Sequence, residues 1–410
     1  MPGRSMQAVS RLLTTLIVLL PSALAACADV IEDCVQDGDP QQQLHACTAV
    51  IDGEYYWGAD LVFAYVNRGN AHTALGAYRD AVTDYSEAIR LSPGDRLAYS
   101  GRGVAHLERN KIEQGIADLT TALRIDPDFA YAYQTRGIAH FRLGRPEDAV
   151  QDFDESIRLD PSDPAVYKRR GDAFFELGQF QRAIDDFDQA ISMNPSVGSS
   201  FNNRGLAREA LGDTEGALRD YNEAVRLDPF HPAAFSNRGN IYFDLDQLDR
   251  AVQDFSSAID MSPSDGSVYL NRGAAYSELG KHSKALADYD EAIRLGTVHM
   301  GIHRNRAWSF YHLAQHQEAV TAAEQALSLD QDDPLKHEVR GYALAAHDQW
   351  ERAAAALETA FRSGHGERWD LYRKALRAQG YLDADREEFQ PKELAAALLS
   401  CLKANCRLEQ

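Results

Sequence analysis

The stretch Tyr65–Gly69 reads YVNRG, and close variants of it return at multiples of 34 residues, as YSGRG (99–103), YKRRG (167–171) and YLNRG (269–273). Its arginine recurs in one unbroken phase, at Arg68, Arg102, Arg136, Arg170, Arg204, Arg238, Arg272, Arg306 and Arg340. Glycine follows that arginine everywhere except at Ala307. A period of this length predicts stacked supersecondary units, because one such unit cannot bury its apolar face alone.

Each unit predicts two helices joined by a tight turn. In AVTDYSEAIRL (81–91), the residues Ala81, Tyr85 and Ala88 lie on one stripe at helical spacing. The preceding YVNRGNAHTAL (65–75) predicts the first helix of the unit. Prolines then stop the second helix in six successive units, at Pro93, Pro127, Pro161, Pro195, Pro229 and Pro263. The fold class is therefore all-α.

Composition excludes some partners. The chain has 410 residues, of which 44% are hydrophobic and 25% are charged, as in soluble globular proteins. Its formal net charge of -20 repels nucleic acid and anionic lipid headgroups. We therefore expect a protein or peptide ligand and no nucleic acid.

These repeats resemble the tetratricopeptide repeat over residues 62–367, as nine units in one phase, with the eighth and ninth drifting from the pattern. The resemblance implies a right-handed superhelical α-solenoid of stacked helical hairpins with a concave groove. Residues 27–61 are then expected to form a degenerate capping hairpin, and residues 368–410 a short helical C-terminal cap.

The recurring arginine departs from the family, which usually has leucine there. An aspartate follows sixteen residues later, on the second helix, in seven consecutive units. A buried unpaired arginine costs several kcal/mol, whereas a paired one roughly breaks even. We therefore predict structural ion pairs, within a unit or between neighbours, for Arg68–Asp84, Arg102–Asp118, Arg136–Asp152, Arg170–Asp186, Arg204–Asp220, Arg238–Asp254 and Arg272–Asp288. Arg306 and Arg340 face Ala322 and Ala356 at the matching places, so they are expected to lack this partner.

The residue before each arginine faces the groove in the family. Here it is asparagine in four consecutive units, and a row of amides can bind an extended peptide backbone through both donors and acceptors. The alternative, solvated helix residues without a ligand, stays open. The candidate groove residues are Asn67, Asn203, Asn237, Asn271, Asn305, Asn70, Lys168, Asn202, Asn240 and Arg304.

Other kinds of site are not indicated. A two-carboxylate peptide clamp is rejected, because Asp172 stands where asparagine should follow Lys168. His72, His106 and His140 share one repeat position, but packed helices about 8–10 Å apart cannot bring three imidazoles to one metal. No nucleophile elbow, phosphate loop or dinucleotide fingerprint occurs. We expect a non-enzymatic protein without catalytic residues, cofactor or metal.

The first 26 residues predict an export signal. Arg4 and Arg11 precede the apolar Leu12–Leu20, and small residues follow Pro21. Cleavage after Ala25 and a lipoprotein-type cleavage before Cys27, which would then carry lipid, stay open as alternatives. Either process places the chain in the periplasm, in the second case as a membrane-anchored lipoprotein.

Cysteine usage agrees with an oxidising compartment. Cys34 and Cys47 flank a GDP turn, and Cys401 and Cys406 lie near the C-terminus, so both pairs predict disulfides. The C-terminal segment also faintly resembles small peptidoglycan-binding modules. The main hypothesis is an exported scaffold that binds a peptide or partner protein in its groove. The alternative is a wall-associated protein that contacts peptidoglycan through this segment and recruits wall enzymes.

Overall fold

A computed structural model of the chain describes residues 30–36, 38–53, 56–297, 299, 301–363, 367–383, 386, 389–404 and 406. Within those residues the regular structure is helical, with no strand. The predicted export segment 1–26 and Cys27 lie outside the described residues. The chain divides into two units, residues 1–212 and 213–410.

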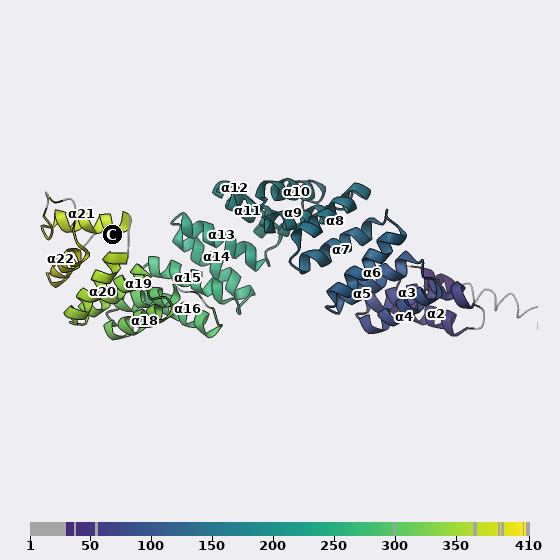
Figure 1. The fold of residues 1–410 in the computed structure, drawn as a ribbon, viewed down its shortest axis with the longest axis horizontal. Helices are drawn as coiled ribbons and strands as arrows, with labels where there is room; N and C mark the ends of the chain where they lie inside the picture. The colour runs from purple at the N-terminus through teal and green to yellow at the C-terminus, as the bar shows by residue number, and fades with distance from the viewer. Residues whose placement is uncertain are drawn as a thin grey trace, which may run out of the picture. The chain divides into compact units, whose positions relative to one another are not determined.

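Unit 1 begins with helical residues 30–35 and continues as a run of helices about thirteen residues long. Its helices are α2 (Pro40–Asp52), the short 3-10 helix η1 (Gly58–Leu61), α3 (Val62–Ala74), α4 (Tyr78–Leu91), α5 (Arg96–Glu108), α6 (Ile112–Ile125), α7 (Ala130–Arg142), α8 (Pro146–Leu159), α9 (Pro164–Glu176), α10 (Phe180–Met193) and α11 (Gly198–Ala210). Consecutive helices pair into hairpins from α3 to α10, and each hairpin packs on the next (Figure 1).

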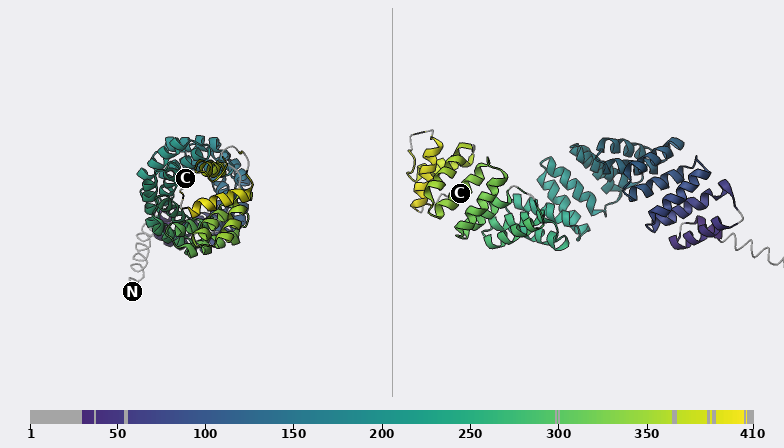
Figure 2. Two further views of the ribbon diagram at one scale, coloured as in Figure 1. Left: turned by 90° about the vertical axis from the view of Figure 1, so that its left-hand side faces the viewer. Right: turned by 60° about the horizontal axis from the view of Figure 1, so that its bottom comes forward.

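Unit 2 continues the same pattern. Its helices are α12 (Thr214–Leu227), α13 (Pro232–Asp244), α14 (Leu248–Met261), α15 (Gly266–Glu278), α16 (His282–Arg294), α17 (Ile302–His312), α18 (His316–Leu329), α19 (Pro334–Ala346), α20 (Trp350–Ser363), α21 (Glu367–Ala378) and α22 (Pro391–Lys403). The hairpins from α13 to α20 stack in chain order, as the right-hand view of Figure 2 shows.

Two sequence features hold each hairpin closed. First, the turn residue after the first helix adopts a left-handed conformation, which glycine takes at no steric cost, as at Gly178 (φ 68°). Ala314 (φ 57°) and Asp348 (φ 60°) hold the same conformation in the two drifting repeats. Second, the two helices of a hairpin cross closely at small residues: a Cβ added to Gly69 would lie 2.8 Å from the ring of Tyr85.

The core of the stack is a column of large side chains from the second helices. These share the repeat position of Tyr85 and are almost completely buried, as Tyr85, Leu119, Phe153, Phe187, Tyr221, Phe255 and Tyr289. Alanines at the crossing points, such as Ala81 and Ala251, have no exposed surface. The repeated apolar stripe of the sequence is therefore the interior of the solenoid.

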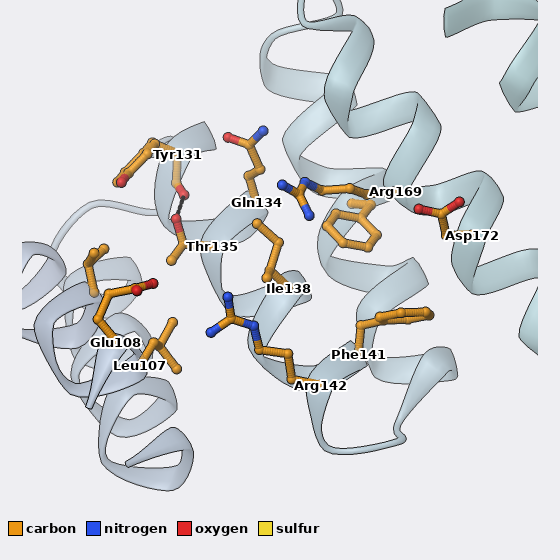
Figure 3. A pocket seen from close by; sticks show the side chains of 12 residues that line it. Leu107, Glu108, Tyr131, Gln134, Thr135, Ile138, Phe141, Arg142, Arg169 and Asp172 are labelled. Atoms are coloured by element: carbon orange, nitrogen blue, oxygen red, sulfur yellow. Dashed lines mark hydrogen bonds between the residues drawn. The ribbon is translucent and has the colours of Figure 1, made fainter. Parts of the chain in front are cut away.

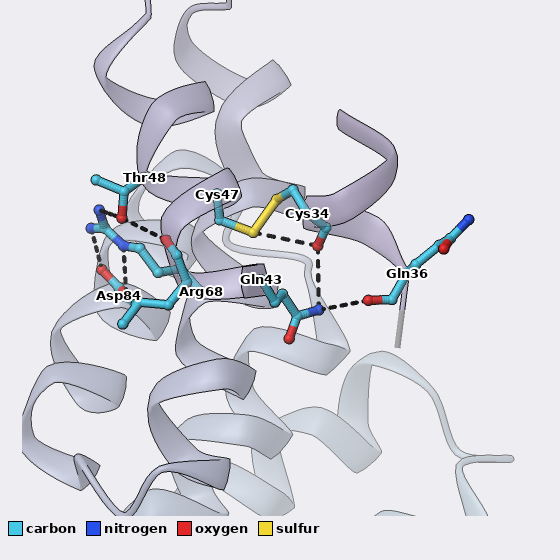
Figure 4. The surroundings of a disulfide bond; sticks show 8 residues. Cys34, Gln36, Gln43, Cys47, Thr48, Arg68 and Asp84 are labelled. Atoms are coloured by element: carbon cyan, nitrogen blue, oxygen red, sulfur yellow. Dashed lines mark hydrogen bonds and ion pairs between the residues drawn. A yellow bond between two sulfur atoms is a disulfide. The ribbon is translucent and has the colours of Figure 1, made fainter. Parts of the chain in front are cut away.

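Both ends of the described chain carry covering structure. At the start of unit 1, Cys34 and Cys47 form a disulfide with their Cα atoms 4.8 Å apart, which ties residues 30–35 to α2 (Figure 4). At the end of unit 2, α22 packs its buried Leu398 on α20. The Tyr372 hydroxyl of α21 donates to the buried Glu338 at 2.5 Å. Cys401 pairs with Cys406 beside this cluster.

Candidate functional site

The recurring arginines bind the aspartates of their own hairpins through two parallel hydrogen bonds. Nε and Nη2 donate to the two carboxylate oxygens over 2.7–2.9 Å in six hairpins, at Arg68–Asp84, Arg102–Asp118, Arg136–Asp152, Arg170–Asp186, Arg238–Asp254 and Arg272–Asp288. In four of these arginines the carboxylate's hydrogen bond is the leading cause of a raised pKa, at Arg68, Arg102, Arg238 and Arg272. The sequence left open whether these ion pairs form within one repeat unit or between neighbouring units. In all six, both partners belong to the same hairpin.

The remaining guanidinium nitrogen reaches back to the preceding hairpin, which the sequence analysis did not foresee. Nη1 of Arg102 donates to the Ser86 hydroxyl over 3.2 Å. The matching nitrogen of Arg170 donates to Asp154 over 2.6 Å. The partner stands sixteen residues before the arginine in five of these six hairpins and twenty residues before it at Arg68, so each of the six arginines links its own aspartate to the preceding helical pair. Figure 4 shows the first of these links, with Arg68 between Asp84 and Thr48.

The other three arginines differ. Arg204 belongs to unit 1, where it binds Asp188 at 2.5 Å, and Asp220 belongs to unit 2, so their predicted pairing stays a prediction. Arg306 has alanine, Ala322, at the place of the paired aspartate, as the sequence shows. It instead binds Asp290 of the preceding hairpin at 2.8 Å. Arg340 keeps a buried Nε that has no hydrogen-bond partner among the described residues.

Each of the three histidines at one repeat position lies beside the paired aspartate of its own hairpin. His72, His106 and His140 each place Nε2 3.7–3.8 Å from an oxygen of the paired aspartate. Burial lowers the pKa of His106 and His140, against the pull of that carboxylate. Within the described residues no three metal-ligating side chains converge on one point.

An open pocket of about 510 Å³ lies on the first helices of three successive hairpins in unit 1, α5, α7 and α9. Leu107, Ile138 and Phe141 supply apolar surface to it. Arg142 and Arg169 direct their guanidinium groups from α7 and α9 toward Ile138 (Figure 3). Both arginines are exposed, and neither has an ion-pair partner among the described residues.

Two more pockets, in unit 2, use the same repeat positions. One of about 430 Å³ is lined by α15, α16 and α17, and one of about 450 Å³ by α17, α19 and α22. The shared positions are those of Asn67, Asn70, Thr73 and Ala74 in the first repeat, which we call the inner face. The inner-face residues in the three pockets are Val104, Leu107, Glu108, Thr135, Ile138, Phe141, Arg142, Arg169, Asp172, Ala274, Ser277, Glu278, Asn305, Trp308, Tyr311, His312, Tyr342, Ala345 and Ala346.

Seven of the ten predicted groove residues belong to this face, Lys168, Asn202 and Arg304 stand one position before it, and several of the ten are held by neighbours. In unit 1, Asn203 donates to Asp172 over 2.7 Å and accepts from the buried Asn202 over 3.1 Å. Asp172 also accepts from Lys168 over 3.0 Å. These four side chains form one polar cluster across α9 and α11.

The other candidate asparagines are also placed by contacts. In unit 2, Asn271 donates to Asn240 over 3.0 Å, and Arg304 donates to Asn305 over 3.5 Å. Asn70 in unit 1 accepts from the hydroxyl of Tyr85 over 2.7 Å. The remaining two candidates, Asn67 and Asn237, lie half-buried on α3 and α13.

Sequence reasoning missed most of the pocket-lining residues. It considered the position of Asn67 and, in part, that of Asn70, but not the positions of Thr73 and Ala74. Helical spacing could have found them, since residues three and four places after Asn70 share its face of the helix.

Family models for the tetratricopeptide repeat match this chain. One matches residues 101–164, 134–198, 168–232 and 202–266, a second residues 69–109, and a third residues 267–295. Together they run without a gap from 69 to 295, more than half of the chain. The chain belongs to the tetratricopeptide repeat family. It is an all-α tetratricopeptide repeat solenoid, the fold of a protein-interaction scaffold.

Several solved structures are similar to this tetratricopeptide repeat protein. A tetratricopeptide repeat protein from Parabacteroides merdae is 17% identical and covers 61% of this chain and 98% of its own, with a TM-score of 0.48. The pilF protein of Pseudomonas aeruginosa is 19% identical over 52% of this chain and 96% of its own, with a TM-score of 0.47. YrrB, described as having an unusual peptide-binding site, is 20% identical over 47% and 96%, with a TM-score of 0.41. No curated protein matches the sequence.

The helices of this tetratricopeptide repeat protein are short. Across its described residues, none has both the length and the apolar character needed to cross a membrane.

Proposed function

We propose that this protein is a non-enzymatic scaffold that binds a peptide segment of a partner protein on its inner face. The observation that carries the proposal is the unit 1 pocket, whose walls come from three successive repeats. A site built this way suits an extended chain, which crosses one repeat after another. Leu107, Ile138 and Phe141 offer contact for an apolar side chain, and about 25 cal/mol per Å² is gained for apolar surface removed from water.

The charges of the pocket select the ligand further. Among the described residues Arg142 and Arg169 have no ion-pair partner, whereas Asp172 is already held by Lys168 and Asn203, and the exposed Glu108 is the second acid of the lining. A carboxylate of the peptide would therefore find two guanidinium groups beside the apolar floor. Guanidinium groups bind carboxylates with charge-assisted hydrogen bonds, which are about twice as strong as neutral ones. We propose a segment with an apolar side chain next to an acidic one.

Selection of displayed peptides on the processed, oxidised chain tests this proposal. We expect enriched peptides to carry an apolar residue beside Asp or Glu. The double substitution of Arg142 and Arg169 to alanine should weaken their binding at least about tenfold, since two charge-assisted contacts are lost. Arg145→Ala is the matched control, because Arg145 is also exposed but does not line the pocket. Equal losses in the double variant and the control would refute the site.

We propose that the protein works in the periplasm. Its mature N-terminus would be either Ala26 or a lipidated Cys27. The Cys34–Cys47 disulfide supports an oxidising compartment. Cell fractionation and mass spectrometry of the mature N-terminus test both points, and a cytosolic chain with an intact leader would refute them. The alternative, contact with peptidoglycan through residues 368–410, requires retention on purified sacculi that disappears when those residues are deleted.

A further inference from the structure

The unit 2 pocket formed by α15, α16 and α17 differs in chemistry from the pocket of unit 1. Its lining residues are Ala274, Ser277, Glu278, Gly280, His282, Tyr289, Asn305, Trp308 and His312. No lysine or arginine stands among them, while the unit 1 pocket has two arginines. The unit 1 pocket, which also contains Glu108 and Asp172, therefore carries cationic side chains at the inner-face positions, and this unit 2 pocket has none in its lining.

One polar group in this pocket is buried without a good hydrogen bond. The hydroxyl of Tyr289 makes no hydrogen bond of good geometry among the described residues, although the side chains of Ser277 and Asn305 lie close enough to lower its pKa against the effect of burial, and its side chain has no exposed surface. In the first repeat the equivalent Tyr85 donates to Asn70 over 2.7 Å. The position of Asn70 is taken by Ala274 here, so the partner is missing and space is left in its place. A buried hydroxyl without a good hydrogen bond is unfavourable, and a ligand's hydrogen bond would offset that cost.

Aromatic rings form another wall. His282 and His312 stack with their ring centroids 4.6 Å apart and their planes 5° from parallel. Trp308 lies 5.9 Å from His312, with an interplanar angle of 28°. Burial lowers the pKa of both histidines, and for His282 the neighbouring His312 lowers it further. Both rings are therefore neutral near pH 7, and they add aromatic surface without positive charge.

The pocket also has a free negative charge. Glu278, at the end of α15, is exposed and has no ion-pair partner among the described residues. The side chain of Asn305 lies on the same pocket, where its amide oxygen accepts a long 3.5 Å bond from Arg304 and its amide approaches the Tyr289 hydroxyl. The site thus combines a carboxylate, acceptor oxygens and aromatic surface.

We propose that this pocket binds an arginine side chain of a partner protein. A guanidinium group has five donors and no acceptor, and its flat face stacks on aromatic rings. It would donate to Glu278 and to the hydroxyl oxygen of Tyr289, and lie against Trp308. The chain's net charge of -20 favours the approach of a basic segment. The inference rests on the proposed scaffold function only in that the ligand is part of a protein.

The test uses short capped peptides and the processed, oxidised full chain. The probe is acetyl-Gly-Gly-Arg-Gly-Gly-amide, with citrulline as the neutral isostere and lysine as the second cation. Binding is followed through the indole N–H signal of Trp308 in NMR spectra, assigned with Trp308→Phe. We expect the arginine peptide to shift this signal and to bind about fivefold tighter than the citrulline peptide, the upper end of what one exposed ion pair gives. Equal binding of arginine and citrulline, or of arginine and lysine, would overturn the assignment.

Variants locate the contact. Glu278→Gln should weaken arginine binding about fivefold. Glu176→Gln is the matched control, because Glu176 is exposed at the same repeat position in unit 1, and it should change nothing. Ala274→Asn restores the partner that Tyr85 has, so we expect a higher melting temperature together with weaker arginine binding. Unchanged binding in Glu278→Gln, or in a stabilised Ala274→Asn, would contradict the site.

This outcome is independent of the unit 1 experiment. If the arginine peptide does not bind near Trp308, the selection of acidic peptides by Arg142 and Arg169 can still succeed. If that selection fails, arginine binding can still be measured at Trp308. The two proposals can therefore be refuted separately.

Discussion

Breaking one arginine–aspartate pair should destabilise the repeats around it strongly. Arg238 donates to both oxygens of Asp254 over 2.7 and 2.8 Å, and to the exposed Asn222 of the preceding hairpin over 2.9 Å. The side chains of Arg238 and Asp254 are only 16% and 6% exposed. Asp254→Asn keeps the shape but removes the countercharge, and losing one partner of a buried pair costs about 3–5 kcal/mol. We expect about 3 kcal/mol, because Arg238 keeps a little access to water.

Two further variants give the comparison. Asn222→Ala removes a bond to an exposed group and should cost no more than about 1 kcal/mol. Arg238→Leu combined with Asp254→Ala removes both charges, and replacing a buried pair by apolar groups is often close to neutral. The eighth and ninth repeats already place alanine at the position of Asp254. The double variant should therefore be more stable than Asp254→Asn alone.

Hydrogen exchange is the suitable assay, because repeats can open locally and a single unfolding free energy need not describe the whole array. A loss of about 3 kcal/mol corresponds to roughly a hundredfold faster exchange of the protected amides in α13 and α14. Exchange that speeds up equally in Asp254→Asn and Asn222→Ala would refute the reasoning. So would a double variant that exchanges as fast as Asp254→Asn.

Three other predictions concern the frame of the molecule. Replacing Cys34 and Cys47 by serine should destabilise the first helices by about 3 kcal/mol, given a separation of 13 residues, and faster exchange confined to α2 and its neighbours would show it. Gly101→Ala should cost about 1–3 kcal/mol, because the new methyl group would lie 2.5 Å from Tyr85, while Gly94→Ala, with no atom within 4 Å, should cost far less in urea titrations. Stability should fall as pH drops from about 7 to 5.5, because the unfolded state protonates histidine near pH 6.5 while burial depresses the pKa of folded histidines. A urea midpoint that stays constant over that range would contradict this for the histidines concerned, His106, His140, His282, His303 and His312.

The hairpin itself could be predicted from the sequence, because every part of it depends on residues close along the chain. The sixteen-residue separation of Arg68 and Asp84 spans one turn between two helices, so the repeat period was enough to suggest the pair. The link from Arg102 to Ser86 was not foreseen, although its separation is also sixteen residues. It depends on how one hairpin lies against the next, and that angle follows from packing rather than from a motif.

The candidate site was predicted less completely for the same reason. The bond from Asn203 to Asp172 joins residues 31 apart on successive first helices. No local sequence pattern predicts a contact over 31 residues. Because of this contact, the side-chain amide of Asn203 already has a hydrogen-bond partner within the protein. The missing partner of Tyr289 is clear only by comparison with the contact that Tyr85 makes. A repeat sequence allows such a comparison, but only once one repeat shows what the position does.

The arginines that pair with aspartates and the residues of the inner face occupy neighbouring positions on the first helix, but only the inner-face residues vary from repeat to repeat. Arg170 binds Asp186 just as Arg68 binds Asp84, and the residues that close each hairpin hardly vary along the chain. The residue immediately before the arginine, about 100° away around the helix, changes from Thr135 to Arg169. Because the folding contacts are fixed on one side, the inner face can change from repeat to repeat without loss of structure. If the inner face binds a partner as we propose, recognition would follow the order of side chains along the stack, and the pocket with Arg142 and Arg169 and the pocket with Glu278 would select different residues.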